Sequence, residues 1–244
     1  MISLKGVTKA FHENTVINNV TLEFETGKKY ALIGPNGVGK TTLINLLSNV
    51  LLPDKGTILL DEQPLGYRYN ANRNIYVILA GDRGLHWRLS ARQNIIYFLS
   101  LKGFGKRESL AAINKNMLQF HFTELLNKRV EEMSFGQKKK VMLFIGFISN
   151  VKILIIDEIT EGLDIDSREE LKKILDLFTN SGKIVIFTTH DLAFASEIAD
   201  RVIFVNKERI SEPMDMEDCN DLLKTYYEKK QGEENDEVFQ LLGK

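Results

Sequence analysis

The chain of 244 residues is long enough for one domain with a large hydrophobic core, and its 43% hydrophobic and 27% charged residues are ordinary usage for a soluble globular protein. A net charge of −1 gives no sign of nucleic acid as a partner, and the single cysteine, Cys219, excludes an internal disulfide and fits a reducing compartment. The N-terminus lacks the pattern of a signal peptide, and the longest apolar run, residues 141–148, is too short to cross a membrane, so work at a membrane would need a second chain.

The first segments predict an antiparallel β layer. Residues 2–11 and 16–24 alternate apolar and polar side chains, which is the period-two pattern of half-buried strands. Phe11, at the end of the first of these strands, fits two roles, stacking on an adenine base or packing in the core. The pattern alone does not decide between them.

A glycine-rich loop follows the apolar strand 30–33 and precedes an apolar helix. Residues 34–42 read GPNGVGKTT and fit the spacing of a phosphate-binding loop, which is glycine, four residues, then Gly-Lys-Thr. Glycines let backbone N–H groups turn toward a phosphate, and the helix start adds its own N–H groups and positive dipole end. We expect Lys40 to reach the β- and γ-phosphates and the Thr41 hydroxyl to bind Mg²⁺. The loop residues expected to contact the nucleotide are Gly34, Asn36, Gly37, Gly39, Lys40, Thr41 and Thr42.

The chain after the loop predicts short elements. The helix should end near residue 50, before the turn at 53–56, and residues 57–60 predict a strand. Residues 63–74 are polar and aromatic, with Pro64 and Gly66, and predict a loop. Residues 75–80 are apolar, which predicts a strand buried on both faces.

A helical insert follows this strand. Apolar residues recur at helical spacing in residues 91–101 and 110–120, with Ser90 as the expected N-cap of the first helix. No strand pattern is found as far as residue 148. The insert therefore spans about residues 85–148.

The second half alternates strands and helices. Strands are predicted at 152–156 and 183–188, helices at 167–178, with Ser167 as N-cap, and at 192–199, and a closing hairpin at 201–205 and 209–210. This order predicts a mainly parallel sheet with right-handed crossovers.

Polar residues at the ends of these strands predict one site. Ligands of such sheets lie at the carboxyl ends of the strands, where Gly34, Asp157 and His190 all fall. Asp157 is expected to hold Mg²⁺ beside Thr41. Glu158, one residue further on, is expected to face the γ-phosphate and polarise an attacking water.

Three further segments resemble a known family. Residues 133–138, MSFGQK, resemble the signature motif of ABC transporter ATPases, usually written Leu-Ser-Gly-Gly-Gln. Residues 159–164, ITEGLD, look like the D-loop of that family, and His190 matches its switch histidine. With the phosphate-binding loop and the carboxylate pair, the motifs follow the family's order, and the resemblance covers roughly residues 1–215.

The resemblance implies a site shared between two subunits. In this family the signature completes the nucleotide site of a partner subunit, so that two head-to-tail subunits enclose two ATP molecules. It implies that Ser134, Gly136, Gln137 and Asp164 contact the partner's ATP. It also implies that His190 contacts the γ-phosphate and helps Glu158 to position water.

The chain departs from the family pattern at two places. Phe135 replaces the first glycine of the signature. Gly81, with Asp82 beside it, stands where the Q-loop glutamine is expected, so a contact to Mg²⁺ or water is either missing or supplied by Asp82. Trp87 follows, and it fits either a groove for the permease or the core.

These observations predict an α/β P-loop NTPase over residues 1–215, with an N-terminal antiparallel layer, a helical insert and an acidic C-terminal extension over 216–244. The resemblance implies an ATP- and Mg²⁺-dependent ATPase on the cytoplasmic face of a membrane, paired with an identical or paralogous ATPase subunit. It would power a separate permease that exports a drug, an antibiotic or a peptide. A P-loop kinase or GTPase is disfavoured, because the signature-like segment has no role there. A non-transport ABC-type regulatory or translation factor is the remaining alternative.

Overall fold

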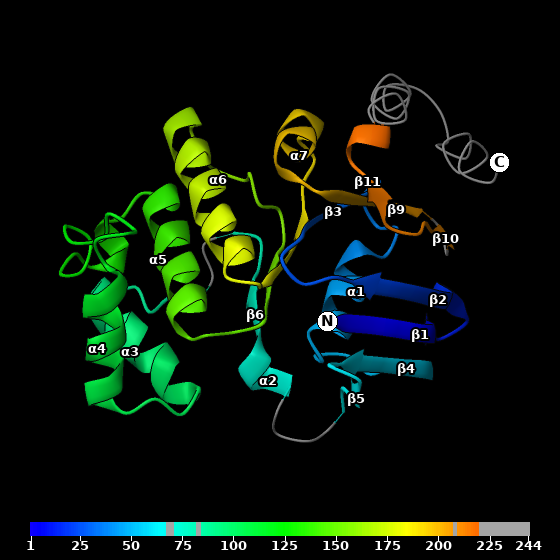
Figure 1. Ribbon diagram of the computed structural model, residues 1–244, viewed down its shortest axis with the longest axis horizontal. Helices are drawn as coiled ribbons and strands as arrows, with labels where there is room; N and C mark the ends of the chain where they lie inside the picture. Colours follow the sequence, from blue (N-terminus) through cyan, green and yellow to red (C-terminus); the bar gives the residue numbers. More distant parts are fainter. Residues whose placement is uncertain (67–70, 82–83, 207–208, 220–244) are drawn as a thin grey trace.

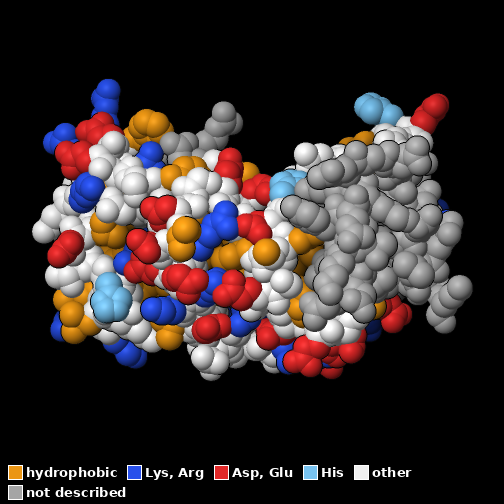
Figure 2. Space-filling model, turned by 90° about the horizontal axis from the view of Figure 1, so that it is seen from above, with side chains coloured by type: hydrophobic (Ala, Val, Ile, Leu, Met, Phe, Trp, Pro, Cys, Tyr) orange, Lys and Arg blue, Asp and Glu red, His pale blue; other side chains and the backbone are white. Residues whose placement is uncertain are grey.

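Two β-sheets and a group of helices make up the computed structural model, which describes residues 1–66, 71–81, 84–206 and 209–219. Helices α3, α4 and α5 lie at one end of the molecule in Figure 1, and strands β1, β2 and β4 lie at the other. Figure 2 shows acidic, basic and hydrophobic side chains interspersed over the coloured part of the face that it presents. Among the described residues, no helix is long and apolar enough to cross a membrane.

The antiparallel layer is confirmed as a four-stranded sheet of order β2-β1-β4-β5. It contains β1 (Ile2–Phe11), β2 (Asn14–Phe24), β4 (Lys55–Leu60) and β5 (Gln63–Pro64). The predicted loop at 63–74 was wrong at both ends, because β5 pairs with β4 and a single helical turn, α2 (Ala71–Asn74), leads into the next strand. Residues 67–70 of that stretch lie outside the described residues.

The predicted parallel sheet is confirmed. Its order is β10-β9-β3-β8-β7-β6, with β11 also paired to β9. Five strands are parallel, and β10 and β11 run antiparallel to β9, so the predicted closing hairpin is present. The strands are β3 (Lys29–Ile33), β6 (Ile75–Ile78), β7 (Ile153–Ile156), β8 (Ile184–Thr188), β9 (Arg201–Asn206), β10 (Arg209–Ile210) and β11 (Met214–Asp215).

Strand β6 differs from the prediction, since it lies at the sheet edge and ends at Ile78. The last hydrogen bond between β6 and the segment of β7 runs from the Asp157 N–H to the Ile78 carbonyl, at 2.8 Å. Leu79 is 50% exposed. The apolar run is therefore not buried on both faces to residue 80.

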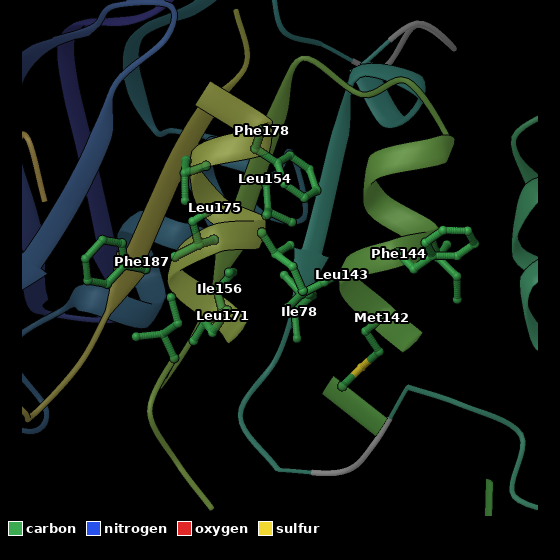
Figure 3. Close-up of a cluster of buried hydrophobic side chains, with 14 of the residues drawn as sticks. Ile78, Met142, Leu143, Phe144, Leu154, Ile156, Leu171, Leu175, Phe178 and Phe187 are labelled. Carbon is green, nitrogen blue, oxygen red and sulfur yellow. The ribbon is translucent and has the colours of Figure 1, made fainter. Parts of the chain in front are cut away.

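Both faces of the parallel sheet are covered, which explains its apolar strands. Ile153 and Ile155 face α1 (Lys40–Leu47) and the antiparallel sheet, whereas Leu154 and Ile156 face the other helices. On that second face, side chains of α5 and α6 pack against β6, β7 and β8 (Figure 3). This packing holds α5 in one position relative to the ends of the β-strands.

The helical insert is confirmed within residues 84–148, where the structure has helices and an isolated bridge between Ser90 and Arg129. Ser90 is the N-cap of the first helix, as predicted, and the Gln93 side chain completes a capping box. The second helix begins earlier than expected, because a Glu108 carboxylate caps the N–H of Gly105 at 2.8 Å. The elements are α3 (Ala91–Leu101), α4 (Lys106–Asn116), the 3-10 turn η1 (Val130–Glu132) and α5 (Phe135–Ile148).

The remaining helices are α6 (Ile165–Asn180), α7 (Leu192–Ile198) and the 3-10 turn η2 (Glu217–Cys219). Ser167 is not the N-cap of α6, because the Asp164 carboxylate takes that place and accepts the Ser167 N–H at 2.8 Å. Helix α1 ends at Leu47, a few residues before the predicted end. Met216 and Cys219 are buried in the core, and residues 220–244 of the predicted C-terminal extension lie outside the described residues.

Candidate nucleotide site

A pocket of about 400 Å³ gathers most of the phosphate-loop residues predicted to bind a nucleotide, together with Phe11 and the two acidic residues after β7. It is lined by Phe11, Val16, Asn36, Gly37, Gly39, Lys40, Thr41, Thr42, Asp157 and Glu158. Phe11 is 43% exposed at this pocket, so the core interpretation of its ring is wrong. Val16 was missed, since a branched apolar residue in a strand looks like any other sheet residue.

The phosphate-binding loop folds around the ammonium of Lys40. This side chain is buried, and its Nζ donates to the carbonyls of Gly34 and Pro35 at 2.7 and 2.8 Å. Gly37 and Gly39 have positive φ angles of 78° and 111°, which side-chain-bearing residues rarely adopt. Gly39 is also the N-cap of α1, so the first N–H groups of the helix face the pocket without a capping side chain. These features fit a bound phosphate chain.

Gly34 has a different place from the other loop residues. A Cβ on this residue would lie 2.1 Å from the carbonyl oxygen of Val205 in β9. Glycine is needed here so that the loop can leave β3 against its neighbouring strand. Gly34 is not among the residues that line the pocket.

The two acidic residues after β7 are held by Thr188, at the end of β8. The buried Thr188 hydroxyl accepts the Glu158 N–H at 2.8 Å and donates to the Asp157 carboxylate at 2.6 Å. His190 Nε2 lies 2.8 Å from Glu158 Oε1. The prediction that these strand ends meet is therefore confirmed. Thr188 was missed, because a threonine that closes an apolar strand carries no signal of its own.

The signature residues line a second, separate pocket of about 430 Å³. It is lined by His121, Glu124, Leu125, Ser134, Gly136, Gln137, Lys140, Asp164, Asp166, Ser167 and Glu170. No residue is common to the two pockets. Ser134 is exposed and caps α5, accepting the Gln137 N–H at 3.3 Å. Hydrogen bonds from Ser167 hold the pKa of Asp164 below its usual value.

The segment where the Q-loop glutamine was expected contacts the D-loop segment. The N–H of Gly81 donates to the Glu161 carboxylate at 2.8 Å, and Gly81 has a φ of 84°. Asp82 lies outside the described residues, so its role stays a prediction. Trp87 is 51% exposed, with the Lys138 ammonium 4.5 Å from the centre of its ring, and the core interpretation of Trp87 is wrong.

A glycine-rich phosphate loop after β3, a carboxylate pair after β7 and a histidine after β8 define an α/β P-loop ATPase. The family model described as ABC transporter matches residues 17–161. The chain belongs to this family, and it is an ATP-binding subunit with ATPase activity.

Three known proteins illustrate the relationship. The SkfA peptide export ATP-binding protein SkfE of Bacillus subtilis (strain 168) is 30% identical over 246 residues, which cover 100% of this chain and 97% of SkfE. The Fe(3+) ions import ATP-binding protein FbpC 1 of Haemophilus influenzae is 30% identical over 208 residues, or 85% of this chain and 63% of FbpC 1. The dimeric ATP-binding cassette MJ0796 bound to ADP and Pi has the same fold, with a TM-score of 0.74, 23% identity, and coverage of 88% and 99%.

Proposed function

We propose that the chain is the motor subunit of an ABC exporter, acting on a separate permease from the cytoplasmic face of a membrane. The observation that carries the proposal is the arrangement around Glu158, whose carboxylate contacts His190 and lines the same pocket as Lys40. In that position Glu158 polarises the attacking water, and His190 assists at the γ-phosphate. Lys40 neutralises the phosphate chain.

Mg²⁺ is the metal that this pocket is proposed to take with ATP. Thr41 and Asp157 both line it, and they supply a hydroxyl and a carboxylate, the oxygen ligands that Mg²⁺ prefers. The Asp157 carboxylate is oriented by the Thr188 hydroxyl. A second oxygen of Asp157 thus stays available for the metal or its water.

A second ATPase subunit, identical or paralogous, is proposed to complete the site. Ser134 is exposed and lines a pocket that shares no residue with the phosphate-loop pocket of its own chain. A head-to-tail pair would bring each signature pocket to the partner's nucleotide. The dimeric form of MJ0796 supports this arrangement.

Export of a peptide, an antibiotic or a drug is proposed as the direction of transport. This chain and the peptide-export protein SkfE match over nearly their whole lengths, whereas the chain spans 63% of the iron-import protein FbpC 1. In the length of the ATP-binding chain, the peptide-export protein is thus the better match.

The ATPase assignment of single residues is tested with two variants of the purified chain. Glu158→Gln should bind ATP but stop turnover, so that an ATP-bound dimer accumulates in gel filtration, and Lys40→Ala should greatly weaken ATP binding. Glu23→Gln and Lys55→Ala, which change exposed charges on strands β2 and β4, serve as controls. Normal hydrolysis by Glu158→Gln would rule out Glu158 as the base, and unchanged ATP affinity of Lys40→Ala would remove the phosphate-loop assignment.

The direction of transport is tested in proteoliposomes that carry the membrane protein that co-purifies with this chain, with the ATPase facing outward. Export predicts that external ATP drives a labelled antimicrobial peptide into the lumen, with no accumulation for Glu158→Gln. Release of preloaded peptide on addition of ATP would contradict export. Failure of the chain to bind any co-expressed membrane protein would favour a non-transport factor.

A further inference from the structure

Lys139 is a buried charge directly behind the proposed catalytic carboxylate. It lies in α5 and is 2% exposed, and its Nζ donates to the carbonyls of Ile159 and Glu158 at 2.7 and 3.1 Å. Burying an ammonium is unfavourable unless it is fully hydrogen-bonded, and an apolar side chain would pack at such a site without that cost. The position of the amine therefore points to a task at the turn that follows β7.

That turn has an unusual backbone at Glu158. Its φ is +49°, in the left-handed region that residues with side chains seldom adopt. Its N–H is held by the Thr188 hydroxyl, and its carbonyl by Lys139 and, at 3.2 Å, by the N–H of Glu161. Because both sides of the residue are fixed, the side chain leaves the backbone in one direction, toward His190.

Helix α5 also contacts the far end of the same turn. The ring of Phe135 lies against Gly162, since a Cβ on Gly162 would come within 2.8 Å of it. Phe135 and Lys139 are four residues apart and share one face of α5, with the ammonium 5.5 Å from the ring centre. The segment from Glu158 to Gly162 is thus held at both ends by one helix.

We propose that Lys139 is a positioning residue for ATP hydrolysis: its ammonium, bound to the carbonyls of Glu158 and Ile159, fixes the left-handed turn that aims the Glu158 carboxylate at the attacking water. The inference rests on the proposed role of Glu158 as the base. Lys139 does not contact the reacting atoms, and it acts through the backbone of the residue that does.

The test compares Lys139→Met with Lys183→Met. Lys183 is a matched control, because it is 8% exposed and its Nζ also donates to a backbone carbonyl, that of Phe147 at 2.9 Å. It immediately precedes β8, at the end of that strand opposite the site. Lys139→Met should lower kcat about 100-fold, the effect of a small misplacement of a catalytic group, with ATP affinity nearly unchanged. Lys183→Met should keep the wild-type kcat.

A second comparison shows whether Lys139 acts through Glu158. In a Glu158→Gln background, Lys139→Met should cause little further loss of residual turnover, because the carboxylate that it positions is already gone. An equal fold-loss in both backgrounds, or a wild-type kcat for folded Lys139→Met, would overturn the inference while leaving Glu158 as the base. Normal turnover by Glu158→Gln alone would instead overturn the proposed role of Glu158, and the inference with it. Should Lys139→Met not fold, Lys139→Gln, which keeps a shorter donor, should show a reduced kcat, and an unreduced kcat would count against the proposal.

Discussion

Substituting Gly162 by alanine should destabilise the protein in two separable ways. Gly162 has a φ of 66°, and a Cβ there would lie 2.8 to 3.1 Å from three ring atoms of Phe135, including the ring carbon nearest its backbone. The ring cannot clear the methyl group by moving its far edge alone. We therefore expect the ring of Phe135, which replaces a signature glycine, to exclude any side chain at Gly162 in the D-loop segment.

The two costs have different sizes and different partners. The left-handed backbone costs an alanine about 1–2 kcal/mol wherever it occurs. The overlap with the ring adds about 1–3 kcal/mol, as is typical when a methyl group is forced into a packed site. Gly162→Ala should therefore cost about 2–5 kcal/mol in the wild type, but only about 1–2 kcal/mol in a Phe135→Ala background, where the ring is absent.

Urea unfolding of the wild type, both single variants and the double variant measures the coupling between the two residues. Gly182→Ala is the control for backbone strain alone, because Gly182 has a φ of 78° and, apart from its chain neighbours, no described residue places a heavy atom within 4 Å of its Cβ position. It should cost the same in both backgrounds. A coupling of less than about 0.5 kcal/mol between Gly162→Ala and Phe135→Ala would refute the steric explanation.

Three further results are expected. Thr188→Val should lower kcat and reduce the free energy of unfolding by about 1–3 kcal/mol, because the hydroxyl bridges the two acidic residues, and unchanged turnover would show that the bridge is dispensable. Thr179→Val removes a buried hydroxyl that donates to the helix carbonyls of Leu175 and Asp176, and it should lower stability alone. Phe11→Ala should raise KM for ATP by the equivalent of about 1–3 kcal/mol with kcat maintained, whereas Phe11→Trp should keep the stacking on the base. Equal KM values for the two variants would exclude stacking by Phe11. Burial lowers the pKa of Lys183 from 10.5 to about 8, so between pH 8 and 10.5 the folded state binds fewer protons than the unfolded state. The free energy of unfolding of the wild type should therefore rise with pH relative to that of Lys183→Met over this window, and parallel curves of the two proteins would contradict the shift.

The parts that the sequence predicted well depend on local patterns. The run GPNGVGKTT sets a loop between a strand and a helix, and the apolar strands place their polar end residues on one edge of a parallel sheet. Asp157 and His190 could be placed near the loop for this reason alone. Fold class and the principal residues of the nucleotide pocket follow from such short-range signals.

The parts that it did not predict depend on contacts between distant segments. Lys139 is the middle of three consecutive lysines at 138–140, a pattern typical of an exposed helix face, and only the packing of α5 against the turn after β7 buries it. The edge position of β6 and the bridging hydroxyl of Thr188 likewise depend on which strands become neighbours. Asp164 and Ser167 are both favourable N-cap residues, and the sequence alone does not show that α6 begins at Ile165 and uses Asp164.

Helix α5 connects the two halves of the proposed dimeric site. Its N-cap, Ser134, belongs to the signature pocket, and Lys139, just over one turn further on, holds the turn of Glu158. The contact between Glu158 and His190 is made by two residues of the same chain. In the proposed dimer, the partner would therefore supply donors to the nucleotide rather than assemble the base. Because buried side chains of α5 pack against the sheet, the same rigid element would set both the placement of Ser134 on the partner's ATP and the orientation of Glu158 toward its own nucleotide in the proposed dimer.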